Sequence, residues 1–348
     1  MSVRRLLEQY GLLRSTGERP PAGPIAAHYQ YFSASFARQN YGDACEAFVA
    51  ALTGDAGLAF RYFMTRSSQA VTQTLEATGK TREVVARLDA LIARFPNINI
   101  LCEGSLSEVE RVHRLREQNI KRGLPSIAVV AQAKSASFSV GNIFSWGFDL
   151  PSFAYSIATL EVVESWARDF ARGGACYTTH LHPLDRNISR LKRAGVTKII
   201  VHVRDPRQGI LSGIHHILRY ESFLHLKQNG FAERTIDEQL EDVMALYARR
   251  ILWLQGWLEA ERELDILFST FEDFSEDRDA FVARYLDYYG GPAKYFRPDL
   301  ALTLREGVDH HYRAGKIDEW KQVFSPSRAA RLSALLPESM KRRFKWPD

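Results

Sequence analysis

Three strand-like runs separated by helical stretches constrain the fold of this chain more than any other feature of its sequence. They are SIAVVAQ at 126–132, KIIVHV at 198–203 and LDILFS at 264–269. Strands that alternate with helices are typical of an α/β domain built on a parallel sheet. The sequence therefore predicts a central parallel sheet flanked by helices over residues 121–348.

The first third of the chain has a different pattern. Residues 1–25 are polar and rich in glycine and proline, which predicts a flexible lead-in. From 26 to 120, apolar residues recur three and four positions apart, as in DACEAFVAALTG and REVVARLDALIARF. We therefore predict an all-helical N-terminal region over 26–120, with a domain boundary near residue 120.

Composition limits the class of protein. The 348 residues are 45% hydrophobic, enough to bury a core, and they include no run of 18 apolar residues. The N-terminus shows no apolar segment with a cleavage site, and the three cysteines form no CxxC pair. We therefore expect a cytoplasmic protein without membrane insertion. A net charge of +5 favours an anionic ligand but is too small and dispersed for a nucleic-acid-binding protein.

The segment AKSASFS at 133–139 links the first predicted strand to a helix. Backbone N–H groups at a helix start attract anions, Lys134 adds a positive charge, and Ser135, Ser137 and Ser139 add hydroxyl donors. The segment is therefore suited to a phosphate group. It is not a Walker A loop, because GxxxxGK[ST] is missing. The alternative is a serine-rich connection with a solvated lysine.

A second candidate anion site follows the next strand, in RDPRQGILS at 204–212. Arg204 lies where the strand ends, and Ser212 lies eight residues later on a helix expected to begin near Pro206. A guanidinium group and a hydroxyl suit a second phosphate, distinct from the one at Lys134. The alternative is a structural ion pair between Arg204 and Asp205, with Ser212 as a small helix residue.

Together with RAGKIDEWK at 313–321, these segments resemble, in order, the three signature segments of sulfotransferases that use 3′-phosphoadenosine 5′-phosphosulfate (PAPS). LFSTFEDF at 267–274 is similar to a further segment of that family, in which the aromatic residue lies beside the adenine. The resemblance runs from about residue 121 to the C-terminus. It implies a P-loop NTPase-like sulfotransferase fold and these PAPS-binding residues: Lys134, Ser135, Ala136, Ser137, Phe138, Ser139, Arg204, Ser212, Phe271, Arg313, Ala314 and Gly315.

The chain departs from the family pattern at several of these positions. The family's loop reads roughly PKSGTTW, so Ala136 stands where a glycine is usual, and a Cβ there restricts how the backbone wraps a phosphate. Ala314 replaces a second basic residue in the late segment, which should weaken the grip on the 3′-phosphate without abolishing it. Phe271 could equally be a core residue.

The resemblance also implies catalytic roles. Lys134 would stabilise negative charge on the bridging oxygen as the bond to sulfur breaks. The general base would be His180 in CYTTHLHP, which resembles the family's KTHLP motif with Thr178 in place of its lysine. His182 is the second candidate. Glu161 and Glu164 are further candidates, because some sugar-directed members use a glutamate.

The leading hypothesis is therefore an enzyme that transfers a sulfuryl group from PAPS to a hydroxyl acceptor and leaves adenosine 3′,5′-bisphosphate, without a metal. One alternative is an inactive nucleotide-binding module whose helical region recruits a partner. Another is a P-loop-like kinase, which the missing Walker A loop disfavours. We expect a carbohydrate or glycolipid acceptor by analogy alone. The helical pattern of residues 232–265 leaves a homo-oligomer open.

Overall fold

The structure is a computed structural model, and it describes residues 24–54, 63, 70–86, 106–157, 160–219, 230–290, 293–301, 316–346 and 348. Its centre is a four-stranded sheet in the order β4-β1-β5-β6, with every neighbouring pair parallel. The strands are β1 (Ile127–Ala131), β4 (Cys176–Thr179), β5 (Lys198–Val203) and β6 (Asp265–Thr270). The predicted parallel sheet is confirmed.

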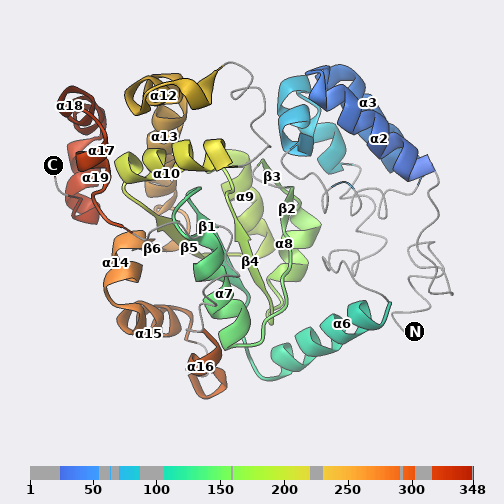
Figure 1. Cartoon of the computed structure of the whole chain (residues 1–348). Helices are drawn as coiled ribbons and strands as arrows, with labels where there is room; N and C mark the ends of the chain where they lie inside the picture. Colours follow the sequence, from blue (N-terminus) through green and yellow to red (C-terminus); the bar gives the residue numbers. More distant parts are fainter. Residues whose placement is uncertain are drawn as a thin grey trace.

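The two faces of the sheet are covered by different helices (Figure 1). In β1, Ile127, Val129 and Ala131 belong to one buried apolar cluster, and Ala128 and Val130 belong to the other. This alternation is the period of a strand, and both faces are buried as a parallel sheet requires. The first face packs on α7 (Ser137–Gly147) and α15 (Arg278–Tyr289). The second packs on α9 (Asp185–Ala194), α10 (Pro206–Arg219) and α13 (Met244–Ala260).

The remaining elements of this domain are short. A two-stranded antiparallel ribbon joins β2 (Ser156–Ile157) to β3 (Glu161–Val162) and is followed by α8 (Glu164–Phe170). α12 (Ile236–Asp242), α14 (Phe271–Glu276) and α16 (Pro298–Ala301) fill the connections, together with 3-10 turns η2 (Phe231–Glu233) and η3 (Ala293–Tyr295). The C-terminus adds α17 (Trp320–Val323), α18 (Pro326–Leu335) and α19 (Glu338–Phe344).

The N-terminal region is helical wherever it is described. It contains α2 (Pro24–Ala37), α3 (Tyr41–Gly54), helical stretches at 70–78 and 81–86, and α6 (Leu106–Lys121). Phe63 packs edge-on against Phe32 with ring centroids 5.2 Å apart, and its centroid is 5.0 Å from that of Phe48. These residues belong to the same buried cluster as the second face of the sheet. The predicted helical N-terminal region is confirmed, whereas the lead-in lies almost entirely outside the described residues.

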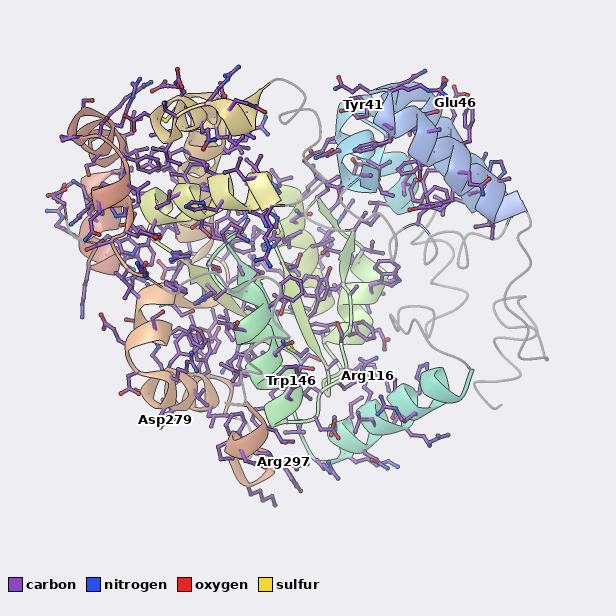
Figure 2. All side chains as sticks on the ribbon, viewed as in Figure 1. Tyr41, Glu46, Arg116, Trp146, Asp279 and Arg297 are labelled. Atoms are coloured by element: carbon purple, nitrogen blue, oxygen red, sulfur yellow. The ribbon has the colours of Figure 1, made fainter. Side chains whose placement is uncertain are left out.

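A buried arginine anchors α6 to the α/β domain. Arg116 pairs with Asp169 at 3.0 Å (Nη1 to Oδ2), donates from Nε to the Gly173 carbonyl at 3.2 Å, and lies 4.2 Å over the Phe153 ring (Figure 2). Within the described residues, none of the helices is both long and apolar enough to cross a membrane. The placement of the domain boundary near residue 120 stays a prediction.

The sequence did not reveal β4. Its four residues, CYTT, are too few and too polar to stand out as a strand, although β-branched threonines favour strands. Pairing with β1 along the register Val129 with Thr178 and Val130 with Thr179 is what stabilises it. This strand places the segment of His180 next to β1.

One buried histidine connects the sheet to the loop that follows β1. His202 of β5 is fully buried, its Nε2 donates to the Ser135 carbonyl at 2.6 Å, and its Nδ1 lies 2.8 Å from the Ser269 hydroxyl of β6. A carbonyl can only accept, so Nε2 carries the proton and Nδ1 accepts from Ser269. Burial lowers the pKa of His202 to about 4.

We expect His202 to make stability pH-dependent. Its folded pKa lies below the value near 6.5 of an unfolded chain, so the unfolded state binds the extra proton as pH falls between these values. Stability is full above pH 6.5 and should drop by about 3 kcal/mol towards pH 4. Urea unfolding at a series of pH values should show this loss in the wild type and a smaller one in His202→Gln. Superimposable pH profiles of the two proteins would contradict the prediction.

Candidate active site

The candidate site lies along the carboxyl edge of the sheet. Reading across the sheet from β4 to β6, the residues that follow each strand are His180, Lys134, Arg204 and Phe271. His180 comes directly after β4, Arg204 directly after β5, and Phe271 begins α14 directly after β6. Ligands of open parallel sheets bind at this edge, because the loops there converge.

The loop after β1 has an unusual backbone. Lys134 and Ala136 both have left-handed φ angles, 69° and 68°. The Ala133 and Lys134 carbonyls accept hydrogen bonds from two arginines, Arg250 Nη1 at 2.5 Å and Arg204 Nη1 at 3.2 Å. α7 then begins, and its first intrahelical bond joins the Val140 N–H to the Ala136 carbonyl at 3.1 Å. Left-handed residues before a helix N-terminus form a concave set of N–H groups that suits an anion.

Ala136, at the position where the family pattern has glycine, is itself in a left-handed conformation. Its φ of 68° and ψ of 32° place it in the left-handed region despite its Cβ. The methyl group does not prevent the loop from forming, but a non-glycine residue in this region costs on the order of 1 kcal/mol.

The serines of the loop differ in what their side chains do. Ser135 is fully buried, and its hydroxyl donates to the Gln132 carbonyl at 2.7 Å, as does its N–H at 3.2 Å. The loop scaffold therefore uses the hydroxyl that we expected to face a ligand. Ser137 is buried at the start of α7 and Ser139 is half-buried. Phe138 projects outward with 57% of its surface exposed.

Lys134 is half-buried among positive charges. Its Nζ donates to Nδ1 of His216, 3.2 Å away on α10. Burial and then the charges of Arg250, Arg204 and Arg219 lower its pKa to about 8. Lys134 is thus mostly protonated at neutral pH but held where positive charge is disfavoured, which is the electrostatic condition of an anion-binding site.

Arg204 links three segments that are distant in sequence. Its Nη1 donates to the Lys134 carbonyl at 3.2 Å, its Nη2 donates to the Lys316 carbonyl at 2.9 Å, and its guanidinium lies 3.8 Å over the Phe271 ring. Phe271 is only 6% exposed, so in this structure the ring holds Arg204. Its predicted contact with adenine stays a prediction.

The third predicted cation, Arg313, lies outside the described residues, as do Ala314 and Gly315. The carbonyl that Arg204 binds belongs to Lys316, the residue directly after Gly315. The segment at 313–321 therefore contacts Arg204 through Lys316, the first of its residues that the structure describes.

Ser212 lies on the face of α10 that meets these cations. Gly209 and Gly213 on the same helix lie against the Arg250 guanidinium, and His216 contacts Lys134. Residues three and four apart share a helix face, so Ser212 lies between these positions. It is half-buried. The predicted pairing of Arg204 with Ser212, and its role in binding, stay predictions.

His180 is held with one ring nitrogen available. Its Nδ1 lies 2.6 Å from the Ala131 carbonyl, so that nitrogen carries a proton and Nε2 has the lone pair. Burial lowers the pKa of His180, the bond to Ala131 raises it, and the charges of Arg250 and Lys134 lower it. The net effect is a lowered pKa, which keeps the ring neutral and able to accept a proton at neutral pH.

The other candidate bases are in different surroundings. His182 is half-buried, and burial also lowers its pKa. Glu161 is fully buried and pairs with Arg190 at 2.8 Å, and Glu164 pairs with Arg193 at 2.8 Å. These ion pairs favour the structural role of both glutamates, and His180 is the candidate that shares charged neighbours with Lys134.

Two site residues were missed by sequence reasoning, Arg250 and His216. Both are helical residues outside the motifs, on α13 and α10, and nothing in their local sequence marks them. The glycines at 209 and 213 are the one available signal, because small residues four apart on a helix indicate close approach of another group. Within the described ranges, no group of three or more His, Cys, Asp or Glu side chains could hold a metal ion.

Comparison with known proteins matches one part of the chain to a protein family. Residues 175–306 match the family model of the sulfotransferase domain. The match includes β4, β5, β6 and α13 and begins after the Lys134 loop. Among solved structures, the chain is similar to mouse sulfotransferase SULT7A1 complexed with PAP, at 15% identity and a TM-score of 0.41, over 66% of this chain and 90% of that chain. No curated protein matches in a sequence search.

The structure brings Lys134, Arg204 and Arg250 together at the carboxyl edge of a parallel sheet. Residues 175–306 of the chain match the sulfotransferase domain, as the signature segments in the sequence predicted. The predicted resemblance is thereby confirmed, and sulfuryl transfer is the reaction class.

Strain at Ala136 gives a test of the loop conformation. Ala136→Gly should raise the free energy of unfolding by about 1 kcal/mol, because glycine adopts a left-handed φ without a Cβ penalty. As a control, Ala248→Gly on the exposed face of α13 should lower it by a similar amount, since glycine is unfavourable inside a helix. Denaturant unfolding measures both. A destabilising effect of Ala136→Gly would show that the loop does not take this conformation.

Proposed function

We propose that the enzyme transfers a sulfuryl group from PAPS to a hydroxyl acceptor and releases adenosine 3′,5′-bisphosphate. The observation that carries the proposal is the contact of the Lys134 loop with Arg204, with Lys134, Arg204 and Arg250 clustered around it. Clustered cations in a half-buried site need an anion to offset their repulsion. A doubly phosphorylated nucleoside with a sulfate offers several negative groups.

The residues present fit such a co-substrate. The loop of Lys134 and the N-terminus of α7 would hold the phosphosulfate, and Arg204 with Ser212 would hold the 3′-phosphate. Arg313, Ala314 and Gly315 would complete that end. PAPS supplies a sulfuryl group already activated by its phosphate leaving group, so the protein needs to position it, stabilise charge and remove one proton.

The roles of Lys134 and His180 follow from their charge states. Lys134, protonated at neutral pH, stabilises the negative charge that develops on the bridging oxygen. His180, kept neutral by burial and by its cationic neighbours, accepts the acceptor's hydroxyl proton at Nε2. The Ala131 carbonyl fixes the tautomer that makes this possible. His182 remains the second candidate for the base.

We also propose a carbohydrate or glycolipid acceptor. The support is the N-terminal helical region, whose buried residues continue the apolar cluster beneath α10 and α13. Glu76, on the helical stretch 70–78, interacts electrostatically with Arg249 of α13, and Arg249 acts in turn on His182. The helical region therefore lies near the end of β4, where it can extend the wall of an acceptor site for a large substrate.

Nucleotide binding tests the first part of the proposal. Calorimetric titration should show tight binding of adenosine 3′,5′-bisphosphate to the wild type, with about 10-fold or greater loss in Lys134→Ala and in Arg204→Ala, because each removes a charge-assisted contact. Arg262→Ala, which removes an exposed charge beyond α13, should bind like the wild type. Absence of binding to the wild type would overturn the proposed function.

Acceptor and base are tested in one screen. The wild type and His180→Asn are each incubated with PAPS that carries a labelled sulfuryl group and with sugars, phenols or peptides as acceptors. Transfer of the label to the acceptor is measured. We expect transfer to a carbohydrate, and a loss of about 100-fold or more in His180→Asn with unchanged bisphosphate affinity, because asparagine can still donate to Ala131 but cannot act as a base. Equal transfer rates in the two proteins would exclude His180 as the base. Binding without any transfer would favour the inactive-module alternative.

A further inference from the structure

Arg250 is the charged residue of the site that no motif predicts. It lies on α13, which follows α10 in the chain, and its Nη1 donates to the Ala133 carbonyl at 2.5 Å. The residue it holds is the one directly before Lys134. Arg250 and Arg204 therefore reach the Lys134 loop from different elements. Arg204, at the end of β5, donates to the carbonyl of Lys134.

The surface of α10 is shaped to admit this guanidinium. A Cβ added at Gly209 would lie 3.1 Å from Nη1 of Arg250, and one at Gly213 would lie 3.6 Å from its Nη2. At Gly209 a side chain would therefore press on the arginine. The two glycines, one helical turn apart, let the guanidinium approach α10 closely, on the face that also carries Ser212 and His216.

The charge of Arg250 reaches both reacting groups. Burial, and then the charge of Arg204, lower the pKa of Arg250 to about 10, so it stays positively charged at neutral pH. It is the foremost charged neighbour in lowering the pKa of Lys134, and also in lowering the pKa of His180. The hydrogen bonds agree: Arg250 binds the carbonyl of Ala133, next to Lys134, and His180 binds the carbonyl of Ala131, two residues earlier in the same segment.

Resting on the proposed function, we propose that Arg250 binds the sulfuryl group itself, between the leaving-group cation Lys134 and the base His180. In transfer, the sulfur–oxygen bond to the phosphate breaks while the acceptor oxygen bonds to sulfur, and the sulfuryl oxygens carry negative charge throughout. A guanidinium fork can donate two parallel hydrogen bonds to two such oxygens. One N–H of Nη1 donates to the Ala133 carbonyl, and this bond fixes the direction of the other N–H groups of the guanidinium.

The proposed roles of Arg250 and Arg204 predict different effects on the binding of two nucleotides. PAPS and adenosine 3′,5′-bisphosphate share both phosphates, and only PAPS carries the sulfuryl group. Removal of a residue that binds the sulfuryl group should weaken PAPS selectively. Removal of a residue that binds the 3′-phosphate should weaken both nucleotides by the same factor. A residue that merely props the loop should also weaken both.

The experiment is a pair of equilibrium titrations, with PAPS and with the bisphosphate, in the absence of acceptor. We expect Arg250→Gln to weaken PAPS about 10-fold or more and the bisphosphate less than about 3-fold, with Arg250→Lys intermediate. Arg204→Gln should weaken both equally. Arg262→Gln, which removes an exposed arginine beyond the C-terminal end of α13, should change neither affinity.

A second variant keeps the arginine and moves it. Gly209→Ala places a methyl group 3.1 Å from Nη1, and should reduce PAPS affinity by a smaller factor with the same selectivity. If Arg250→Gln does not fold, Gly209→Ala still tests whether Arg250 binds the sulfuryl group. Equal losses for both nucleotides, or no loss for PAPS, would overturn the role of Arg250. A wild type that binds neither nucleotide would instead overturn the proposed function, so the two failures are distinguishable.

Discussion

The site depends on the repulsion among three cations that the fold holds together, Lys134, Arg204 and Arg250. Burial raises the cost of each charge, and their neighbours raise it further, as the lowered pKa of Lys134 shows. The protein offsets part of this cost with uncharged partners: backbone carbonyls, the ring of Phe271 and the imidazole of His216. Because such dipoles do not neutralise the charge, the site keeps a net positive charge, which is the basis of the proposed binding of an anion.

The sheet and its supports keep this arrangement rigid. His202 joins the loop to β5 and β6 through two hydrogen bonds in a fully buried position. The start of α10 is fixed by the buried pair of Asp205 and Arg207 at 2.7 Å, and Arg207 reaches the C-terminal helices through the Trp320 ring, 4.4 Å away, and the Ser333 hydroxyl at 2.9 Å. The C-terminus is therefore part of the structure that orients Arg204. These supports explain how a loop with two left-handed residues is maintained.

Catalysis and binding are assigned to different strand ends. The end of β5 carries the proposed 3′-phosphate contact, and the ends of β1 and β4 carry the proposed reacting groups, Lys134 and His180. The order of strands places Lys134 between His180 and Arg204. Arg250 and His216 come from the helices on one face of the sheet, so the same packing that buries the apolar cluster also completes the charged site.

The sequence by itself determined the helical N-terminal region, the parallel sheet with three of its four strands, and the Lys134 and Arg204 segments, because these depend on local periodicity and on motifs of adjacent residues. It also indicated His180. Only the tertiary structure decided that CYTT is a strand, that Ser135 is committed to the scaffold, and that Arg250 belongs to the site. A four-residue strand is stabilised by its neighbour, a hydroxyl's partner is set by the backbone around it, and a helical arginine acquires a role through contacts more than 100 residues away. Long-range packing creates these interactions, and no local pattern encodes them.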